Sequence, residues 1–447
     1  MPSFFEYNFQ AEGHSIKTKF STGLFINGKF VNGSNNTTID VINPTTGKLI
    51  NKVSEGTEKD VDRAVQAAQK AYDTTWGLNV CGVQRGKILI RIAELIERDI
   101  DEIAAVEALD NGKAFTIAKG FDASEAAACF RYYGGWATST TESCWTDHSM
   151  ELPAADVCME ACTSLATGNT IIIKPSEFTP LSLFVSLRCS KRLVFQPALS
   201  MSLTDMAKLS ARLSSHMKIE KVAFTGSTAV GRTIMKAAAA SNLKNVTLEL
   251  GGKSPNIIFN DATSRPPFVG LRLVYFFNHG QCCCAGSRVF VQSGVYNRFV
   301  ELFTAHVQKL KVGDPFKSET FQGPQVSQIQ FDRIMGYIES GKSQGATVAI
   351  GGERIGSEGY FIQPTVFTDR SKFEDEADII RQANDSIYGL AAAVFSRDIS
   401  RALDVAHKLH AAQWFKQSGI GRELGEYALS NYTNIKAVHV NLTEPPP

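Results

Sequence analysis

A stretch in the middle of the chain, VAFTGSTAVGRT at 222–233, constrains the fold most strongly. An apolar run typical of a β-strand ends at Gly226-Ser227, and a helix-like segment follows at once. In this order, N–H groups at the start of the helix can cradle a phosphate beyond the end of the strand. The pattern is typical of sheets that bind nucleotides, and it favours an α/β fold.

The same stretch is close to a P-loop. Gly226 and Gly231, followed by Arg232-Thr233, nearly reproduce its spacing. However, Arg232 stands where the lysine that reaches the terminal phosphates belongs. No convincing strand for a magnesium ligand accompanies the segment. A nucleoside triphosphatase is therefore an alternative hypothesis for this part of the chain.

A second apolar run, Ile171–Ile173, ends at Lys174, and the next residues turn the chain toward a helix through Glu177. Open α/β sheets bind nucleotides at the carboxyl ends of their strands. Lys174 and Glu177 are therefore candidates for contacts with a nucleotide, although this signal is weak by itself.

Three adjacent cysteines, Cys282 to Cys284, lie in FFNHGQCCCAGSR at 276–288. A zinc site is a poor interpretation, because adjacent cysteines diverge and no C-x-x-C or histidine pair accompanies them. Buried structural cysteines and a catalytic nucleophile remain as alternatives. The flanking Gly280 and Gly286 favour a tight, closely approached loop, and a nucleophilic thiol there would need a nearby base or N–H dipoles.

A candidate base lies in VTLELGGKSP at 246–255. Apolar and polar residues alternate up to Glu249, which predicts a strand that ends at the turn Gly251-Gly252. Glu249 is either a solvated residue of an edge strand or a carboxylate that takes a proton from a thiol or activates water on a thioester.

The composition limits the partners of the protein. The 447 residues contain 46 Lys and Arg against 45 Asp and Glu, which gives no electrostatic case for nucleic acid or an anionic membrane. No apolar run approaches the roughly 18 residues of a membrane span. Nine scattered cysteines and the lack of a secretory pattern predict a cytoplasmic protein. The length allows two or three domains.

Taken in order, these stretches resemble the NAD(P)-dependent aldehyde dehydrogenase superfamily, in its broad-substrate, fungal-like class. The segment 248–255 matches the glutamate motif of the family, and 276–285 matches its cysteine motif with Cys283 on the nucleophile. The spacing between Glu249 and Cys283 is also that of the family. Further matches lie at 25–34, 108–122, 359–367, 388–395 and 416–429.

The resemblance implies the chemistry of the site. Cys283 would attack an aldehyde to form a thiohemiacetal, hydride transfer to NAD would leave a thioester, and Glu249 would activate the water that releases the acid. Lys174 and Glu177 would hold the adenosine ribose, and Glu177 favours NAD over NADP. The pyrophosphate would lie on the turn and helix marked by Gly226, Ser227 and Gly231. No metal is implied.

The resemblance also implies an organisation. A Rossmann-type NAD-binding domain would span 21–249 and an α/β catalytic domain 250–420. The segment 421–447 would return to the cofactor and oligomerisation region. A homodimer or homotetramer is expected, with a small-molecule aldehyde as the substrate. The sequence does not name that aldehyde.

Several segments depart from the family. Glu151 occupies the place of an oxyanion-binding asparagine, and the first nucleotide-binding strand is expected to be lost near 137–150. Short segments are missing near 368–371 and 412–415. The altered stretches 137–164, 190–213 and 262–274 regain the family pattern when read in another frame. A catalytically impaired or frameshift-corrupted copy, or an error in the recorded sequence, is therefore the alternative hypothesis.

Overall fold

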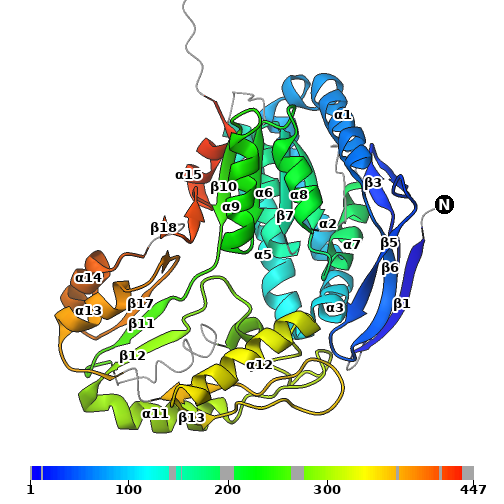
Figure 1. Cartoon of the computed structure of the whole chain (residues 1–447). Helices are drawn as coiled ribbons and strands as arrows, with labels where there is room; N and C mark the ends of the chain where they lie inside the picture. Colours follow the sequence, from blue (N-terminus) through cyan, green and yellow to red (C-terminus); the bar gives the residue numbers. More distant parts are fainter. Residues whose placement is uncertain are drawn as a thin grey trace, which may run out of the picture.

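The computed structural model describes residues 3–11, 14–139, 147–152, 154–191, 206–262, 276–368, 372–411 and 415–434. Figure 1 shows two main sheets, each covered by helices, and so confirms the predicted α/β class. The larger sheet has the strand order β19-β10-β9-β7-β8, and the smaller has the order β15-β12-β11-β17.

The larger sheet brings several strand ends to one edge. Its members are β7 (Asp147–Leu152), β8 (Thr170–Pro175), β9 (Lys221–Thr225), β10 (Asn245–Glu249) and β19 (Gly419–Ile420). β7 to β10 are parallel, whereas β19 is antiparallel to β10. In register, Glu151 lies opposite both Lys174 and Phe224, and Glu249 lies opposite Thr225. The carboxyl ends of the four parallel strands therefore meet at one edge.

The expected loss of a strand near 137–150 is wrong. β7 occupies Asp147–Leu152 and lies in the centre of the sheet, between β8 and β9. The error has a physical reason. A parallel strand covered on both faces is normally a continuous apolar run, whereas DHSMEL mixes charged and polar residues.

Helices cover both faces of the larger sheet. They are α1 (Glu58–Thr74), α2 (Gly82–Arg98), α3 (Ile100–Asn111), α4 (Phe115–Ile117), α5 (Ser124–Ser139), α6 (Ala154–Ala166), α7 (Leu181–Lys191), α8 (Met206–Ser215) and α9 (Thr228–Ala239). Neighbouring side chains of β8 point to opposite faces of the sheet. Ile171 and Ile173 pack into the hydrophobic core on one face, and Ile172 packs into the core on the other face. This two-sided burial fixes the sheet between its helical layers.

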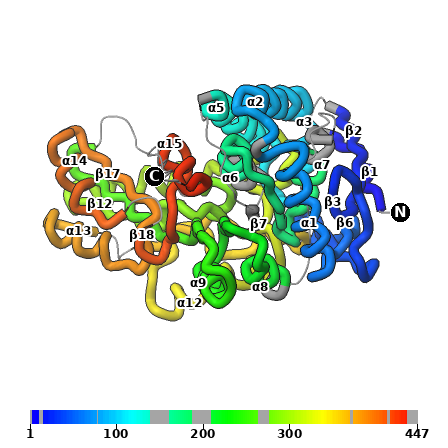
Figure 2. The backbone as a smooth tube through the Cα atoms, turned by 90° about the horizontal axis from the view of Figure 1, so that it is seen from above, coloured from blue at the N-terminus to red at the C-terminus, as the bar shows by residue number. Residues whose placement is uncertain are grey.

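The smaller sheet is parallel throughout. Its strands are β11 (Pro255–Ile258), β12 (Arg288–Gln292), β15 (Lys372–Phe373) and β17 (Ala393–Phe395). The helices α11 (Ser293–Val307), α12 (Gln328–Ser343), α13 (Glu376–Asn384) and α14 (Ile399–Lys408) accompany it. Ile257 and Ile258 of β11 face separate cores. Figure 2 shows α13 and α14 at the end of the molecule opposite β1.

Short antiparallel pairs complete the fold. These are β1 (Phe4–Ala11) with β2 (His14–Ser21), β3 (Leu24–Ile26) with β4 (Lys29–Val31), β5 (Thr38–Asn43) with β6 (Lys48–Ser54), β13 (Thr347–Ile350) with β14 (Val366–Thr368), and β16 (Tyr388–Gly389) with β18 (Phe415–Lys416). β18 and β19 return the chain from the smaller sheet to β10. The short helix α15 (Gly425–Leu429) follows.

Parts of the altered stretches lie outside the described residues, namely 140–146, 153, 192–205 and 263–274. The gaps expected near 368–371 and 412–415 fall largely on positions that are likewise outside them. Among the helices that are described, none combines the length and apolar character required to cross a membrane.

Candidate active site

The structure brings Cys283 and Glu249 together between the two sheets. Glu249 is the last residue of β10, and Cys283 lies in the loop that precedes β12. The Cys283 Sγ–H donates to Glu249 Oε1 at 3.8 Å. Cys282 and Cys284 lie against each other, with 3.6 Å between their sulfurs. The middle cysteine of the triplet therefore contacts the carboxylate that the sequence singled out.

Glycine allows this close approach. A Cβ on Gly252 would lie 2.8 Å from the carbonyl oxygen of Cys283, whereas a Cβ on Gly251 would meet nothing within 4 Å. The cysteine loop thus packs directly on the backbone of the second glycine. This contact sets the distance between the cysteine loop and the end of the strand that bears Glu249.

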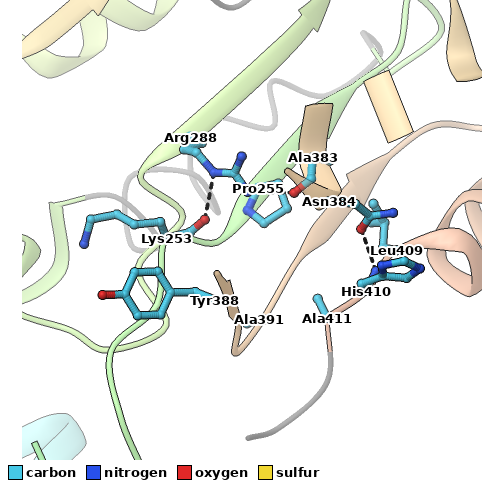
Figure 3. A pocket seen from close by; sticks show the side chains of 11 residues that line it. Lys253, Pro255, Arg288, Ala383, Asn384, Tyr388, Ala391, Leu409, His410 and Ala411 are labelled. Atoms are coloured by element: carbon cyan, nitrogen blue, oxygen red, sulfur yellow. Dashed lines mark hydrogen bonds between the residues drawn. The ribbon is translucent and has the colours of Figure 1, made fainter. Parts of the chain in front are cut away.

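An arginine fixes the next part of the glutamate loop. Figure 3 shows Arg288 beside Lys253 and Pro255 in a small pocket. The Arg288 guanidinium donates to the carbonyls of Lys253, Gln382 and Ala383 at 2.9, 3.2 and 2.7 Å. Neither Cys283 nor Glu249 lines this pocket, and Arg288 instead holds the loop that follows Glu249.

The cysteine loop begins with an unusual backbone turn. Asn278, His279 and Gly280 have φ values of 46°, 60° and 75° in succession. The left-handed region is unfavourable for residues with a Cβ, at about 1–3 kcal/mol each. Such a turn persists only when neighbouring interactions hold it.

The resting Cys283 is a thiol. Its hydrogen bond with Cys282, followed by that with Cys284, burial and the negative charge of Glu249, raises the pKa of Cys283. Hydrogen bonds with Cys282 and Cys283 lower the pKa of Cys284 to about 3. Cys283 nevertheless has the neighbouring carboxylate, and a thiol with a raised pKa requires such a base before it can attack.

Glu249 belongs to a group of acids, with Glu160 and Glu423, that each have a buried carboxylate oxygen and that the sequence did not reveal. Burial, followed by the charges of Glu160 and Glu249, raises the pKa of Glu423 well above its usual range. Burial raises the pKa of Glu160 to about 7, although the charge of Lys221 opposes this. Glu423 lies within a stretch that matches the family, but the match alone assigned it no role.

Lys221 is the cation of this group. It is fully buried at the start of β9, where its Nζ donates to Thr247 Oγ1 at 2.8 Å and lies 3.9 Å from the centre of the Tyr432 ring. Burial lowers the pKa of Lys221 to about 8, against the opposing charges of Glu160 and Glu423. Its partners come from distant segments, which explains why the sequence gave no signal.

The predicted phosphate turn has the local geometry that binds anions. Ser227 caps α9, because its Oγ accepts from the Val230 N–H at 3.3 Å. A Cβ on Gly226 would lie 2.5 Å from the Phe224 ring, and one on Gly231 would lie 2.9 Å from Leu250. Gly226 thus leaves the strand end open, and Gly231 brings the helix close to the sheet. These features fit a dinucleotide pyrophosphate.

Lys174 and Glu177 lie at the same edge, two strands away from β9. Lys174 is 1% exposed, and its Nζ donates to the carbonyl of Pro175 at 3.1 Å. Glu177 is half-buried in the turn that follows β8. Their place beyond the strand end fits the ribose side of a dinucleotide. Lys174 and Glu177 therefore share an edge with the glycine turn, separated from it by β7.

The alternative sites receive no support from the described side chains. No group of three or more His, Cys, Asp and Glu in the described part of the chain is arranged to hold a metal ion. Arg232, the residue at the lysine position of the P-loop pattern, donates to Gln417 Oε1 at 2.7 Å. This contact directs Arg232 toward the returning chain.

A parallel sheet with a glycine turn at its carboxyl edge, next to a thiol that contacts a carboxylate, is an arrangement typical of α/β enzymes that bind a nucleotide. Residues 30–415 match the aldehyde dehydrogenase family. The chain is 49% identical to an aldehyde dehydrogenase of Agaricus bisporus, over 99% of each protein. It is 40% identical to a mitochondrial aldehyde dehydrogenase of Rattus norvegicus, over 95% of this chain and 92% of that protein.

Solved structures agree with the sequence relatives. An NAD+ complex of an aldehyde dehydrogenase from Bacillus cereus superposes with a TM-score of 0.91 at 37% identity, covering 94% of this chain and 97% of that one. The chain belongs to the aldehyde dehydrogenase family, and it is an enzyme that oxidises aldehydes. Because the match extends along almost the whole chain, the alternative of a corrupted copy is not favoured.

Proposed function

We propose that this enzyme oxidises an aldehyde to a carboxylic acid with NAD, using Cys283 as the nucleophile and Glu249 as the base. The contact between the Cys283 sulfur and Glu249 Oε1 is the observation that carries this proposal. Glu249 first accepts the thiol proton, and the sulfur bonds to the carbonyl carbon of the aldehyde. The product of this step is a thiohemiacetal on Cys283.

The remaining steps follow from the same two side chains. NAD, when bound, accepts the hydride that leaves the former carbonyl carbon. Cys283 then carries a thioester. Glu249, after giving its proton to solvent, takes a proton from a water molecule whose oxygen attacks the thioester carbon. The carbon–sulfur bond breaks, the carboxylic acid leaves, and the Cys283 sulfur takes back a proton from Glu249, which is thereby ionised again.

The candidate cofactor residues have distinct roles in this proposal. Gly226 and Ser227 present the start of α9 to the pyrophosphate, and Gly231 holds that helix against the sheet. Lys174 and Glu177 bind the adenosine ribose. A carboxylate at Glu177 repels a ribose phosphate, which favours NAD over NADP.

We assign an NAD-binding domain to 21–249, a catalytic domain to 250–420 and a returning segment to 421–447. The end of the β10 strand at Glu249 supports the first boundary. We also propose a cytoplasmic homodimer or homotetramer. Six free cysteines in the described residues suit a reducing compartment. Exposed Leu424 and Tyr427 suit an interface between subunits.

The nucleophile is tested by exchanging each cysteine of the triplet in turn. Cys283→Ala should abolish NADH formation with short aliphatic aldehydes, whereas Cys282→Ala and Cys284→Ala, the matched controls, should retain most of the rate. A labelled aldehyde should form a covalent adduct with the wild type and not with Cys283→Ala. If Cys283→Ala stays active while one of its neighbours becomes inactive, the assignment of the nucleophile is wrong.

A further inference from the structure

The left-handed turn before the cysteines is closed by one side chain. Gln281 Nε2 donates to the carbonyl of Asn278 at 3.3 Å and lies 3.1 Å from His279 Nδ1. Its Oε1 accepts from the Val326 N–H at 3.1 Å. The glutamine therefore binds both strained residues of the turn and links them to a separate segment of the catalytic half.

The backbone closes the same turn in parallel. The Gln281 N–H donates to the carbonyl of Asn278 at 2.9 Å, and Asn278 Nδ2 donates back to the carbonyl of Gln281 at 3.1 Å. Asn278 and Gln281 thus form a reciprocal pair around His279 and Gly280. Asn278 Oδ1, by contrast, is buried and has no hydrogen-bond partner. The Asn278 side chain therefore forms its hydrogen bond with Gln281 at the expense of an unsatisfied buried oxygen, which is unfavourable for the free energy of folding.

We infer that Gln281 is a positioning residue that holds the left-handed turn 278–280 and thereby aims the Cys283 sulfur at Glu249. Cys283 follows Gln281 by two residues, so a change in the turn moves the thiol directly. The next turn is also tight, because the Ala285 N–H donates to the carbonyl of Cys282 at 3.1 Å. The thiol lies between two tight turns, and Gln281 links the first of them to the segment at Val326. This inference rests on the proposed role of Cys283.

A second glutamine offers a matched control. Gln322 is buried, and its Nε2 donates to the carbonyl of Phe276 at 2.9 Å, just before the left-handed turn. It has the same side chain and also bonds a backbone carbonyl of the cysteine segment. Unlike Gln281, it has no hydrogen bond with the strained residues among its described contacts. Loss of Gln322 should weaken packing without releasing the turn.

The test compares Gln281→Met with Gln322→Met, since methionine keeps the shape and removes the hydrogen bonds. Stopped-flow measurement of the first turnover should show NADH formation slowed by roughly 10²-fold in Gln281→Met, the usual effect of about a 1 Å misplacement. The KM for NAD should stay unchanged, because the candidate cofactor turn lies on the other sheet. Gln322→Met should keep a first turnover close to that of the wild type.

A rescue experiment separates positioning from folding. Glycine adopts the left-handed conformation without a Cβ penalty, so adding His279→Gly to Gln281→Met should restore most of the lost rate. Failure of this double variant to recover, or equal first turnovers in Gln281→Met and Gln322→Met, would overturn the inference. An active Cys283→Ala would instead overturn the proposed function, and the two failures are thus distinguishable.

Discussion

The backbone N–H of Gly226 donates to the carbonyl of Glu249 at 2.9 Å. Gly226 opens the candidate cofactor turn, and Glu249 carries the candidate base on the neighbouring strand. Glu249 is paired with Thr225 at the end of the ladder between β10 and β9, and Gly226 is the next residue after Thr225. The hydrogen bond therefore extends the pairing of these two strands by one step. The candidate cofactor turn and the candidate base are therefore joined at one edge of the larger sheet, and Cys283 approaches this edge from the loop before β12.

Removal of the base should slow both the attack of the Cys283 thiol and the release of the acid. Glu249→Gln keeps the shape of the side chain, but it cannot take a proton from water. Steady-state turnover should fall by roughly 10²–10⁴-fold, the usual contribution of a positioned general base. Formation of NADH in the first turnover should slow as well, because the Cys283 thiol loses the base that takes its proton.

Stopped-flow absorbance of NADH with an aliphatic aldehyde checks both parts of this expectation. Quenched samples analysed by mass spectrometry should show acylated Cys283 forming more slowly in Glu249→Gln than in the wild type. Normal steady-state turnover in this variant would remove Glu249 from the mechanism.

The buried Glu160 should give the protein a pH-dependent stability. Its pKa is raised from 4.5 to about 7, first by burial. Because the folded protein favours the protonated acid, this contribution is fully present below about pH 4.5 and is lost as the pH rises through about 7. Glu160→Gln should remove this part of the slope and leave the variant relatively more stable at neutral pH.

Thermal unfolding midpoints from about pH 5 to about pH 8 test this sign. Glu339→Gln is the control, because Glu339 is exposed on α12 and pairs with Lys342 at the surface. The control should follow the wild-type slope. A Glu160→Gln profile parallel to the wild type would show that Glu160 does not titrate as its burial requires.

Local patterns predicted the strand ends well. Glu249 is the last residue of β10, and Ser227 caps the helix that follows β9, both as the alternation and the glycine turn indicated. These features depend on a few neighbouring residues, so a sequence displays them directly. The assignments of Cys283 as the nucleophile and Glu249 as the base stay predictions.

Features that depend on distant segments were not predictable in this way. A lone Glu160 or Lys221 is ordinarily an exposed residue. Their burial requires Glu423 and Tyr432, more than 200 positions away in the chain. The sequence did not predict β7 either, because DHSMEL is mostly polar and has little strand character. Its pairing with β8 and β9 overrides this local preference.

The position of Glu151 allows a test of the oxyanion site. Its backbone lies at the carboxyl end of β7, in register with Lys174, and the family resemblance places an asparagine there. A carboxylate repels a developing oxyanion, whereas an amide N–H stabilises it. Glu151→Asn should therefore raise kcat by roughly 10²–10³-fold, the usual effect of one oxyanion donor.

Glu151→Ala serves as the comparison, since it removes the charge without supplying a donor. Its kcat should lie between those of the wild type and Glu151→Asn. Equal rates for Glu151→Asn and Glu151→Ala would show that an amide at this position contributes no hydrogen bond to the reaction.

The paired glycines after Glu249 give the sharpest test of how the cysteine loop is placed. An alanine Cβ at 252 would approach the Cys283 carbonyl oxygen to 2.8 Å and Leu390 Cβ to 3.1 Å. The Cys283 oxygen is a backbone atom and Leu390 Cβ is bonded to the backbone, so neither can move away by a side-chain rotation. The cysteine loop itself must therefore shift. Gly252→Ala should lower kcat by roughly 10²-fold, as expected when a reacting group shifts by about 1 Å.

Gly251→Ala is the matched control, because its Cβ would meet nothing within 4 Å. Its kcat should stay within about twofold of the wild type, as is usual for a substitution that creates no contact. Steady-state kinetics at saturating NAD measure both values, and circular dichroism confirms that both variants fold. If Gly251→Ala loses as much activity as Gly252→Ala, backbone flexibility of the turn, rather than the contact with Cys283, explains the need for glycine.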